Sequence, residues 1–133
     1  FSGNWLSEVH DGCIVEFDVD SGKLLGLVIS NLWMPHSVHR FDGRLYYLNS
    51  MLGELRTMGQ VVIGKFAGFM RGMDFSDGYF ALGSTAHSYP ELLAGVSNNI
   101  SLDNGFHIFD PKSKMSRFFR IPGVEIIHDL LWI

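Results

Sequence analysis

The feature that most constrains the fold is a strand–turn–strand unit that recurs along the chain. In its clearest copy, residues 37–41 form a short mixed strand, Asp42-Gly43 a two-residue turn, and residues 44–49 a strand rich in aromatic and aliphatic side chains. Asp-Gly supplies the positive φ angles that a tight type I′ hairpin turn requires. The second strand has the composition of a buried strand. The unit therefore predicts antiparallel β-structure.

Two further copies of this pattern give the repeat length. Residues 14–41 align without gaps on residues 106–133, so residue 14 falls on residue 106 at a shift of 92, and His36 falls on His128. A third copy, with its turn at Asp77-Gly78, lies between them. The shift is twice 46, and one propeller blade spans roughly 40–50 residues.

We therefore expect an all-β fold, a partial β-propeller of about three four-stranded antiparallel blades in a single domain, residues 1–133. Residues 1–32 would be a blade remnant, and residues 33–68 would form a complete blade. Residues 69–122 would form another blade with an inserted loop at 84–104, and residues 123–133 would begin the next innermost strand. The strands expected in the remnant are 4–9, 14–19 and 24–29. The two innermost strands expected in the complete blades are 38–41 and 73–75.

Three blades cannot close a ring, and open edges expose apolar faces and unpaired backbone. This predicts either a piece of a longer chain, since the sequence begins at Phe1 without Met, or a homo-oligomer. The simplest oligomer is a twofold dimer that completes six blades.

Composition and charge exclude several classes of partner. The net charge is −4 and Lys and Arg form no run, so we expect no binding to nucleic acid or to a membrane surface. No apolar run approaches the roughly 20 residues of a membrane helix. No signal peptide is visible, which favours a cytoplasmic location. The single cysteine, Cys13, lies in an apolar run, and we expect it to be a buried structural thiol.

The connection at residues 84–104 departs from the repeat because the same connection in the preceding blade has four residues, 50–53. Connections this long are often functional. A helical turn is expected at 90–93. One interpretation is that the segment covers a sheet edge or packs on a neighbouring blade. The other is a lid over a pocket that presents His87, Tyr89 and Glu91.

The pattern W-x-P-H-S followed by D-G-R-L-x-x-L-N-S-x-x-G-E-L resembles a family of uncharacterised bacterial proteins with propeller folds. Its residues here are Trp33, Pro35, His36, Ser37, Asp42, Gly43, Arg44, Leu45, Leu48, Asn49, Ser50, Gly53, Glu54 and Leu55. The resemblance covers most of the chain. It implies about six blades, related more distantly to the NHL and gluconolactonase-like propellers, and it implies no activity.

The candidate site follows from the repeat. Innermost strands of a propeller line its central channel, and the equivalent positions at their starts are His36, Arg71 and His128. The next residues are Ser37, Gly72 and Asp129. Glu8 could face the same mouth. We expect these residues to form a polar, partly basic ring.

Three chemistries fit such a ring. Imidazoles can hold a metal or act as acid and base near neutral pH, Arg71 can hold a carboxylate or phosphate, or the side chains can hydrogen-bond the backbone of neighbouring blades. We expect no metal and no cofactor, because no ligand motif is present and Arg71 would repel a cation.

The function expected from this ring is a binding or scaffold module for a small anionic or sugar-like ligand at the channel mouth. One alternative is a hydrolase or lyase that uses His36 and His128 with Arg71 as anion clamp. The other is a purely structural module for oligomerisation.

Overall fold

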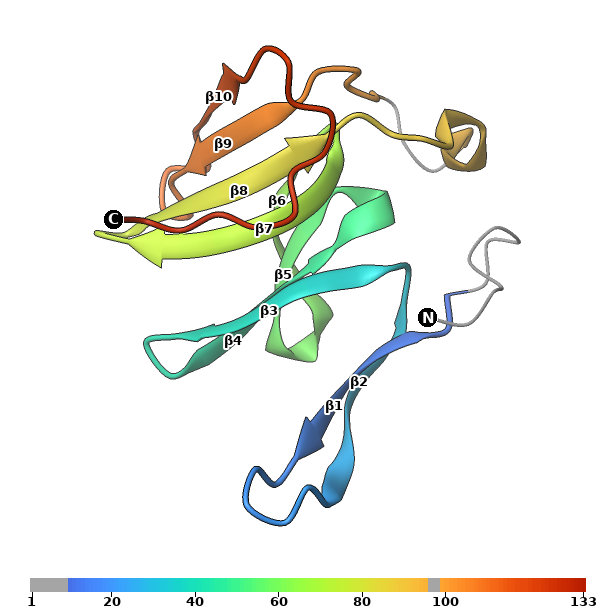
Figure 1. The fold of residues 1–133 in the computed structure, drawn as a ribbon, viewed down its shortest axis with the longest axis vertical. Coiled ribbons are helices and arrows are strands. Elements are labelled where there is room, and N and C mark those ends of the chain that lie inside the picture. The colour runs from blue at the N-terminus through green and yellow to red at the C-terminus, as the bar shows by residue number, and fades with distance from the viewer. Residues whose placement is uncertain (1–9, 96–98) are drawn as a thin grey trace.

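The computed structural model describes residues 10–95 and 99–133, and within them the fold is all-β (Figure 1). Three antiparallel sheets have two, four and four strands. The strands are β1 (Gly12–Phe17), β2 (Leu24–Leu32), β3 (Pro35–Phe41), β4 (Arg44–Asn49), β5 (Glu54–Thr57), β6 (Val61–Lys65), β7 (Phe69–Ser76), β8 (Tyr79–Thr85), β9 (Gly105–Phe109) and β10 (Ser116–Arg120). Short 3₁₀ turns at η2 (Ser50–Leu52), η3 (Met58–Gln60) and η4 (Pro90–Leu93) interrupt the connections.

The two four-stranded sheets follow chain order, β3-β4-β5-β6 and β7-β8-β9-β10. They lie within residues 33–68 and 69–122, the segments for which complete blades are predicted. The first hairpin of each sheet turns at an Asp-Gly pair, and both residues of each pair have positive φ. This is the backbone that a type I′ turn needs to match the twist of its strands. The two Asp-Gly turns are therefore as predicted.

The hairpin turns after β1 and β9 repeat each other in their hydrogen bonds. The Asp18 carbonyl accepts a bond of 2.8 Å from the Gly22 N–H, and the Asp110 carbonyl accepts one of 2.9 Å from the Lys114 N–H. Each carboxylate also accepts a bond from the hydroxyl of the serine three residues further on. The shift of 92 therefore relates the β1–β2 hairpin to β9–β10, the two outer strands of a four-stranded sheet.

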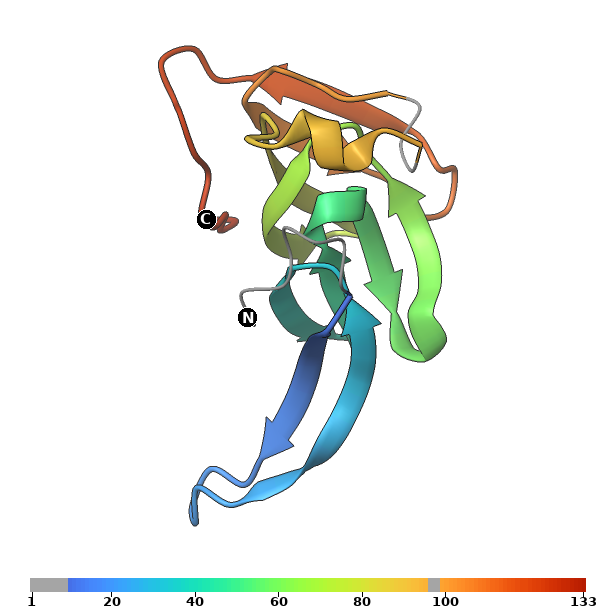
Figure 2. The same ribbon diagram turned by 90° about the vertical axis from the view of Figure 1, so that its right-hand side faces the viewer.

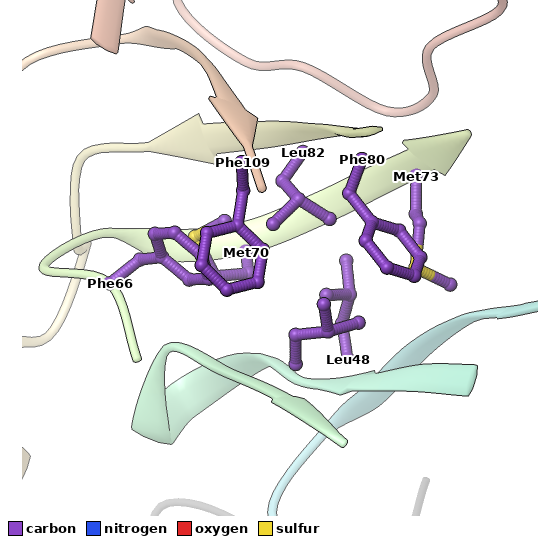
Figure 3. Close-up of a cluster of buried hydrophobic side chains, with 8 residues drawn as sticks. Leu48, Phe66, Met70, Met73, Phe80, Leu82 and Phe109 are labelled. Atoms are coloured by element: carbon purple, nitrogen blue, oxygen red, sulfur yellow. The ribbon is translucent and has the colours of Figure 1, made fainter. Parts of the chain in front are cut away.

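The main core lies between the two four-stranded sheets (Figure 3). Alternate apolar residues of β4 and β5 face those of β7, β8 and β9 across this layer, as strand periodicity requires. The two innermost strands, β3 and β7, also lie against each other. The buried residues of this core are Leu48, Leu55, Phe66, Met70, Met73, Phe80, Leu82 and Phe109.

The β1–β2 sheet projects away from the other two (Figure 2). The strand predicted at residues 4–9 lies outside the described residues. The prediction of a buried Cys13 is wrong, because its thiol is exposed. The neighbouring Ile14 is buried, and successive residues of a strand point to opposite faces, so Cys13 occupies a face that the described residues leave uncovered.

Residues 121–133 form no strand, so the innermost strand that residues 123–133 are predicted to begin is not observed. The segment nevertheless runs beside β7 (Figure 1). The Trp132 N–H donates a bond of 2.8 Å to the Asp74 carboxylate. A Cβ built on Gly72 would lie 2.7 Å from Cα of Asp129. A strand needs a neighbouring strand to bond its backbone, and among the described residues no strand pairs with this segment.

The innermost strands begin earlier than predicted, at Pro35 and Phe69. Each contains a register shift, between His36 and His39 in β3 and between Met70 and Met73 in β7. A bulge lets a strand continue past a residue that does not fit the ladder. The candidate site residues of both blades therefore lie inside strands. Within the described part of the chain, no helix has the length and apolar character to cross a membrane.

Candidate functional site

The bulges of β3 and β7 face each other and link the two sheets. Ser37 has a φ of 50° and Gly72 a φ of 83°. The Gly72 N–H donates a hydrogen bond of 2.9 Å to the Ser37 hydroxyl. On its other side, Gly72 lies against the backbone of Asp129. The structure thus places the equivalent positions Ser37, Gly72 and Asp129 in one row across three successive segments.

The preceding positions, His36, Arg71 and His128, also come near one another. Burial is the main cause that lowers the pKa of His36, and the positive charges of Arg71 and His128 lower it further. The Nδ1 atom of His36 lies 2.8 Å from the Ser50 hydroxyl and 3.0 Å from the Met34 carbonyl. The imidazole is therefore held in place by its own sheet and favours its neutral form.

Arg71 lies on the wall of a cavity of about 150 Å³ beside this row. Its side chain is half-buried. No hydrogen bond or ion pair joins its guanidinium to any other residue that the structure describes. Among the lining residues that the structure describes, Arg71 is the only one with a permanent charge, and none of them carries a carboxylate. The lining residues are Met34, Met51, Phe69, Arg71, Thr85, Ala86, His87, Ser88, Tyr89 and Ile126.

The ring of Phe69 connects two histidines at the cavity wall. His36 contacts Phe69 edge to face at 5.5 Å, and His87 does so at 5.9 Å. Burial lowers the pKa of His87, while a hydrogen bond to the Gly68 backbone opposes this shift. His87 therefore favours its neutral form at neutral pH, which leaves Arg71 as the charged side chain of the described lining.

The sequence offers two interpretations of the connection after β8, packing on a neighbouring sheet or covering a pocket, and the structure has features of both. The predicted helical turn is present as η4. Within this connection, His87 and Tyr89 line the cavity, whereas the exposed Glu91 does not. Leu93 is buried in a second cluster with Trp33 and Met51, which belong to the preceding sheet and its entry. The segment therefore packs on the neighbouring sheet and closes one side of the cavity.

A family model described as Domain of unknown function (DUF4915) matches residues 1–130. The chain belongs to this family. Comparison with curated proteins and with solved structures finds no match. Membership of DUF4915 names no activity, so the chemistry of the site rests on its geometry.

In this DUF4915 chain, most of the W-x-P-H-S and N-S-x-x-G-E motif residues stabilise the fold. The side-chain Oδ1 of Asn49 accepts a bond of 2.7 Å from the backbone N–H of the buried Trp33. The Asn49 amide donates to Glu54, and Glu54 forms an ion pair of 2.6 Å with Arg56. The motif therefore joins the entry of β3 to the β4–β5 connection. Its member His36 contacts Phe69, which lines the cavity.

Two predicted site residues lie on the exposed side of the row, and one lies outside the described residues. His128 and Asp129 are exposed on the segment beside β7. Glu8 is the residue that lies outside the described part of the chain. Among the described residues no three metal-binding side chains gather.

Sequence reasoning did not single out three residues that the site uses: Ser50, Phe69 and Thr85. Ser50 forms a hydrogen bond with His36. Thr85 lies 35 positions after Ser50, and its hydroxyl accepts a bond of 3.2 Å from the Ile127 N–H. The spacing of 35 that relates His36 to Arg71 would have found this pair. Phe69 carries no comparable signal, because aromatic residues occur throughout the core of this chain.

Proposed function

We propose that the chain is a binding module for a small anion, held by Arg71 at the mouth where the innermost strands meet. The observation that supports this most directly is the half-buried Arg71 on the cavity wall, because none of the described residues that share this wall carries a carboxylate. A cation that has lost part of its water gains most from a bound anion. His36 and His87 favour their neutral forms, so neither needs a counter-ion at neutral pH.

The hydrolase or lyase alternative requires an imidazole that reaches the ligand. His36 is not among the cavity-lining residues, and its Nδ1 already contacts Met34 and Ser50. His87 lines the cavity, and a hydrogen bond to the Gly68 backbone engages one of its two ring nitrogens, but no carboxylate among the described lining residues is present to act with it as a second acid or base. A binding role therefore agrees better with this geometry than proton transfer does.

The test is thermal unfolding of the chain with a panel of small anions that includes phosphate, carboxylates and sugar phosphates. A ligand that binds only the folded state stabilises it by about 2.7 kcal/mol at 100 times its Kd. We expect at least one anion to raise the melting temperature of the natural chain and not that of Arg71→Gln. The exposed Arg44, changed to Gln, is the matched control. Equal shifts in both variants would contradict the proposal.

We further propose that the β1–β2 sheet associates with a second copy of the chain. Phe17 and Phe109 are equivalent at the shift of 92, yet Phe109 is 3% exposed and Phe17 is 54% exposed within the described structure. Phe109 is covered by neighbouring sheet residues, including Phe66 at 5.3 Å. Leu25 and Leu27 extend the exposed apolar face. In the β9–β10 copy of the repeat, a neighbouring sheet covers the face that carries Phe109. The equivalent face of β1–β2, which carries Phe17, is therefore suited to contact with a sheet of a second chain.

Light scattering tests this association. A dimer would have about twice the chain mass of 15.0 kDa, and Phe17→Ser should shift it toward the monomer. Tyr79→Ser, which removes another exposed aromatic residue on a different sheet, should not. A monomer at all concentrations, or a dimer unaffected by Phe17→Ser, would refute the proposal.

We also propose a cytoplasmic location, where the exposed Cys13 thiol would stay reduced. Cell fractionation tests this location.

A further inference from the structure

We propose that the ligand of the Arg71 cavity is a monocarboxylate with an apolar body about the size of a benzene ring. This rests on the anion-binding function proposed above and specifies its ligand class. Three properties of the cavity support it: its charge, its lining and its volume.

The charge of the cavity suits one negative charge. Within residues 10–95 and 99–133, Arg71 is the only lining residue with a permanent charge, and His87 favours its neutral form. The planar guanidinium presents two parallel N–H groups that match the two oxygens of a carboxylate. A phosphate dianion has more charge and more acceptor oxygens than this single guanidinium satisfies.

The remaining lining suits an apolar body. Met34, Met51, Phe69 and Ile126 supply thioether, aromatic and aliphatic surface. Methionine side chains adapt to the shape of an apolar ligand, and sulfur makes favourable contacts with aromatic rings. A sugar would place hydroxyl groups against this surface, and burying a hydroxyl without a partner is unfavourable. The lining therefore disfavours the sugar-like ligand that the sequence left open.

The volume limits the size of that body. The cavity measures about 150 Å³, and an apolar cavity of roughly this volume holds one benzene molecule. Three exposed residues of the lining, Ser88, Tyr89 and Ile126, border the solvent, so both polar and apolar groups lie at the boundary with water. A ring or short branched chain would fill the interior, with its carboxylate at Arg71.

The experiment is titration calorimetry of the natural chain with four probes. Benzoate carries both features, benzamide lacks the charge, phenyl phosphate replaces the carboxylate, and glucuronate replaces the apolar body. We expect benzoate to bind more tightly than the other three. Arg71→Gln should weaken benzoate binding at least about tenfold, because hydrogen bonds between charged groups are worth about 1.5–3 kcal/mol. Arg44→Gln should leave it unchanged. Arg71→Lys keeps the charge without the fork, and benzoate should bind it less tightly than the natural chain.

The outcomes separate this inference from the function on which it rests. Tighter binding of phenyl phosphate, lost in Arg71→Gln, overturns the carboxylate and leaves anion binding at Arg71 in place. Tighter binding of glucuronate overturns the apolar body in the same way. If benzamide binds as well as benzoate, or if Arg71→Gln binds every probe as the natural chain does, both the inference and the anion-binding function fail. Failure of all four probes overturns the inference, and the wider anion panel then decides the function.

Discussion

The Ser37 hydroxyl on β3 accepts a hydrogen bond of 2.9 Å from the Gly72 N–H on β7. The two residues are equivalent, since Gly72 follows Ser37 by the same 35 positions that separate His36 from Arg71. Both have positive φ, and both lie at a register shift in their strands. The same irregularity in two repeats thus creates the contact between them. It also fixes the positions of the preceding residues, His36 and Arg71, relative to each other.

Removing the acceptor should destabilise the protein. Ser37→Ala leaves the N–H of the buried Gly72 without a partner, and an unsatisfied buried donor costs about 1–3 kcal/mol. Urea denaturation should show a loss in this range in the free energy of unfolding. Ser116→Ala, on the exposed outermost strand, should change stability by less than about 0.5 kcal/mol. Equal effects of the two changes would show that the inter-sheet bond contributes nothing.

A pair of glycines tests whether residues 124–133 pack against β7. Gly72 and Gly78 have similar φ values of 83° and 87°, so Ala at either position bears a similar backbone strain of about 1–2 kcal/mol. A Cβ at Gly72 would lie 2.7 Å from Cα of Asp129, whereas none lies within 4 Å at Gly78. Gly72→Ala should therefore lower the melting temperature more than Gly78→Ala. If the two variants melt together, the segment does not occupy this position in solution.

The sequence predicts the strands and turns well because their signals are local. An Asp-Gly pair between two apolar runs determines a hairpin turn wherever it occurs, and both pairs have the expected backbone. The shift of 92 also holds in detail, down to the hydrogen bonds of the Asp18 and Asp110 turns. The spacing of 35 relates Ser37 to Gly72, and the shift of 92 relates Ser37 to Asp129. Together they identify the equivalent positions of three successive segments, which is why the row through Ser37, Gly72 and Asp129 could be predicted.

The cavity could not be predicted in the same way. A bulge at a non-glycine residue such as Ser37 has no sequence signature, so the innermost strands were expected to begin too late. The connection after β8 is long enough to form a lid, but its length does not determine which side chains face inward. His87 lines the cavity and Glu91 does not, and this depends on how Leu93 packs on Trp33. The prediction of a buried Cys13 is wrong because an apolar run does not reveal which face of its strand is covered.

The repeated turns predict matched titrations. Hydrogen bonds from Ser21 and Ser113 are the largest cause that lowers the pKa values of Asp18 and Asp110. A carboxyl group whose pKa is lowered by folding stabilises the folded state above its unfolded pKa and loses that contribution as pH falls through the folded value. NMR titration should find both carboxyl groups below the reference value of 3.8. Ser21→Ala should raise the pKa of Asp18 alone, and Ser113→Ala that of Asp110 alone. A variant that leaves its own aspartate unchanged would show that the serine does not determine the shift.

His107 predicts how stability changes with pH. Its ring lies between Phe66 and Phe118, 4.8 Å from each ring centroid. Burial lowers its pKa from 6.5 to about 4. Between these two values the unfolded chain binds a proton that the folded chain does not, so the free energy of unfolding should fall as pH is lowered from 6.5 toward 4. His107→Leu removes this titration and should make the dependence on pH shallower, measured as urea midpoints at pH 7, 6 and 5.

The control for this change is a second histidine with an aromatic neighbour. His39 stacks on Phe41 at 5.4 Å, so His39→Leu also replaces an imidazole beside a ring. The decisive quantity is the difference between the two variants in the slope of stability against pH, because carboxyl groups titrate equally in both. The NMR signal of the His107 ring should shift only near pH 4. Protonation would place a charge between two aromatic rings, and the buried Nδ1 has no hydrogen-bond partner among the described residues. A titration near pH 6.5, or equal slopes for the two variants, would mean that the ring is reached by water and that the sheet around β9 is more open than the structure indicates.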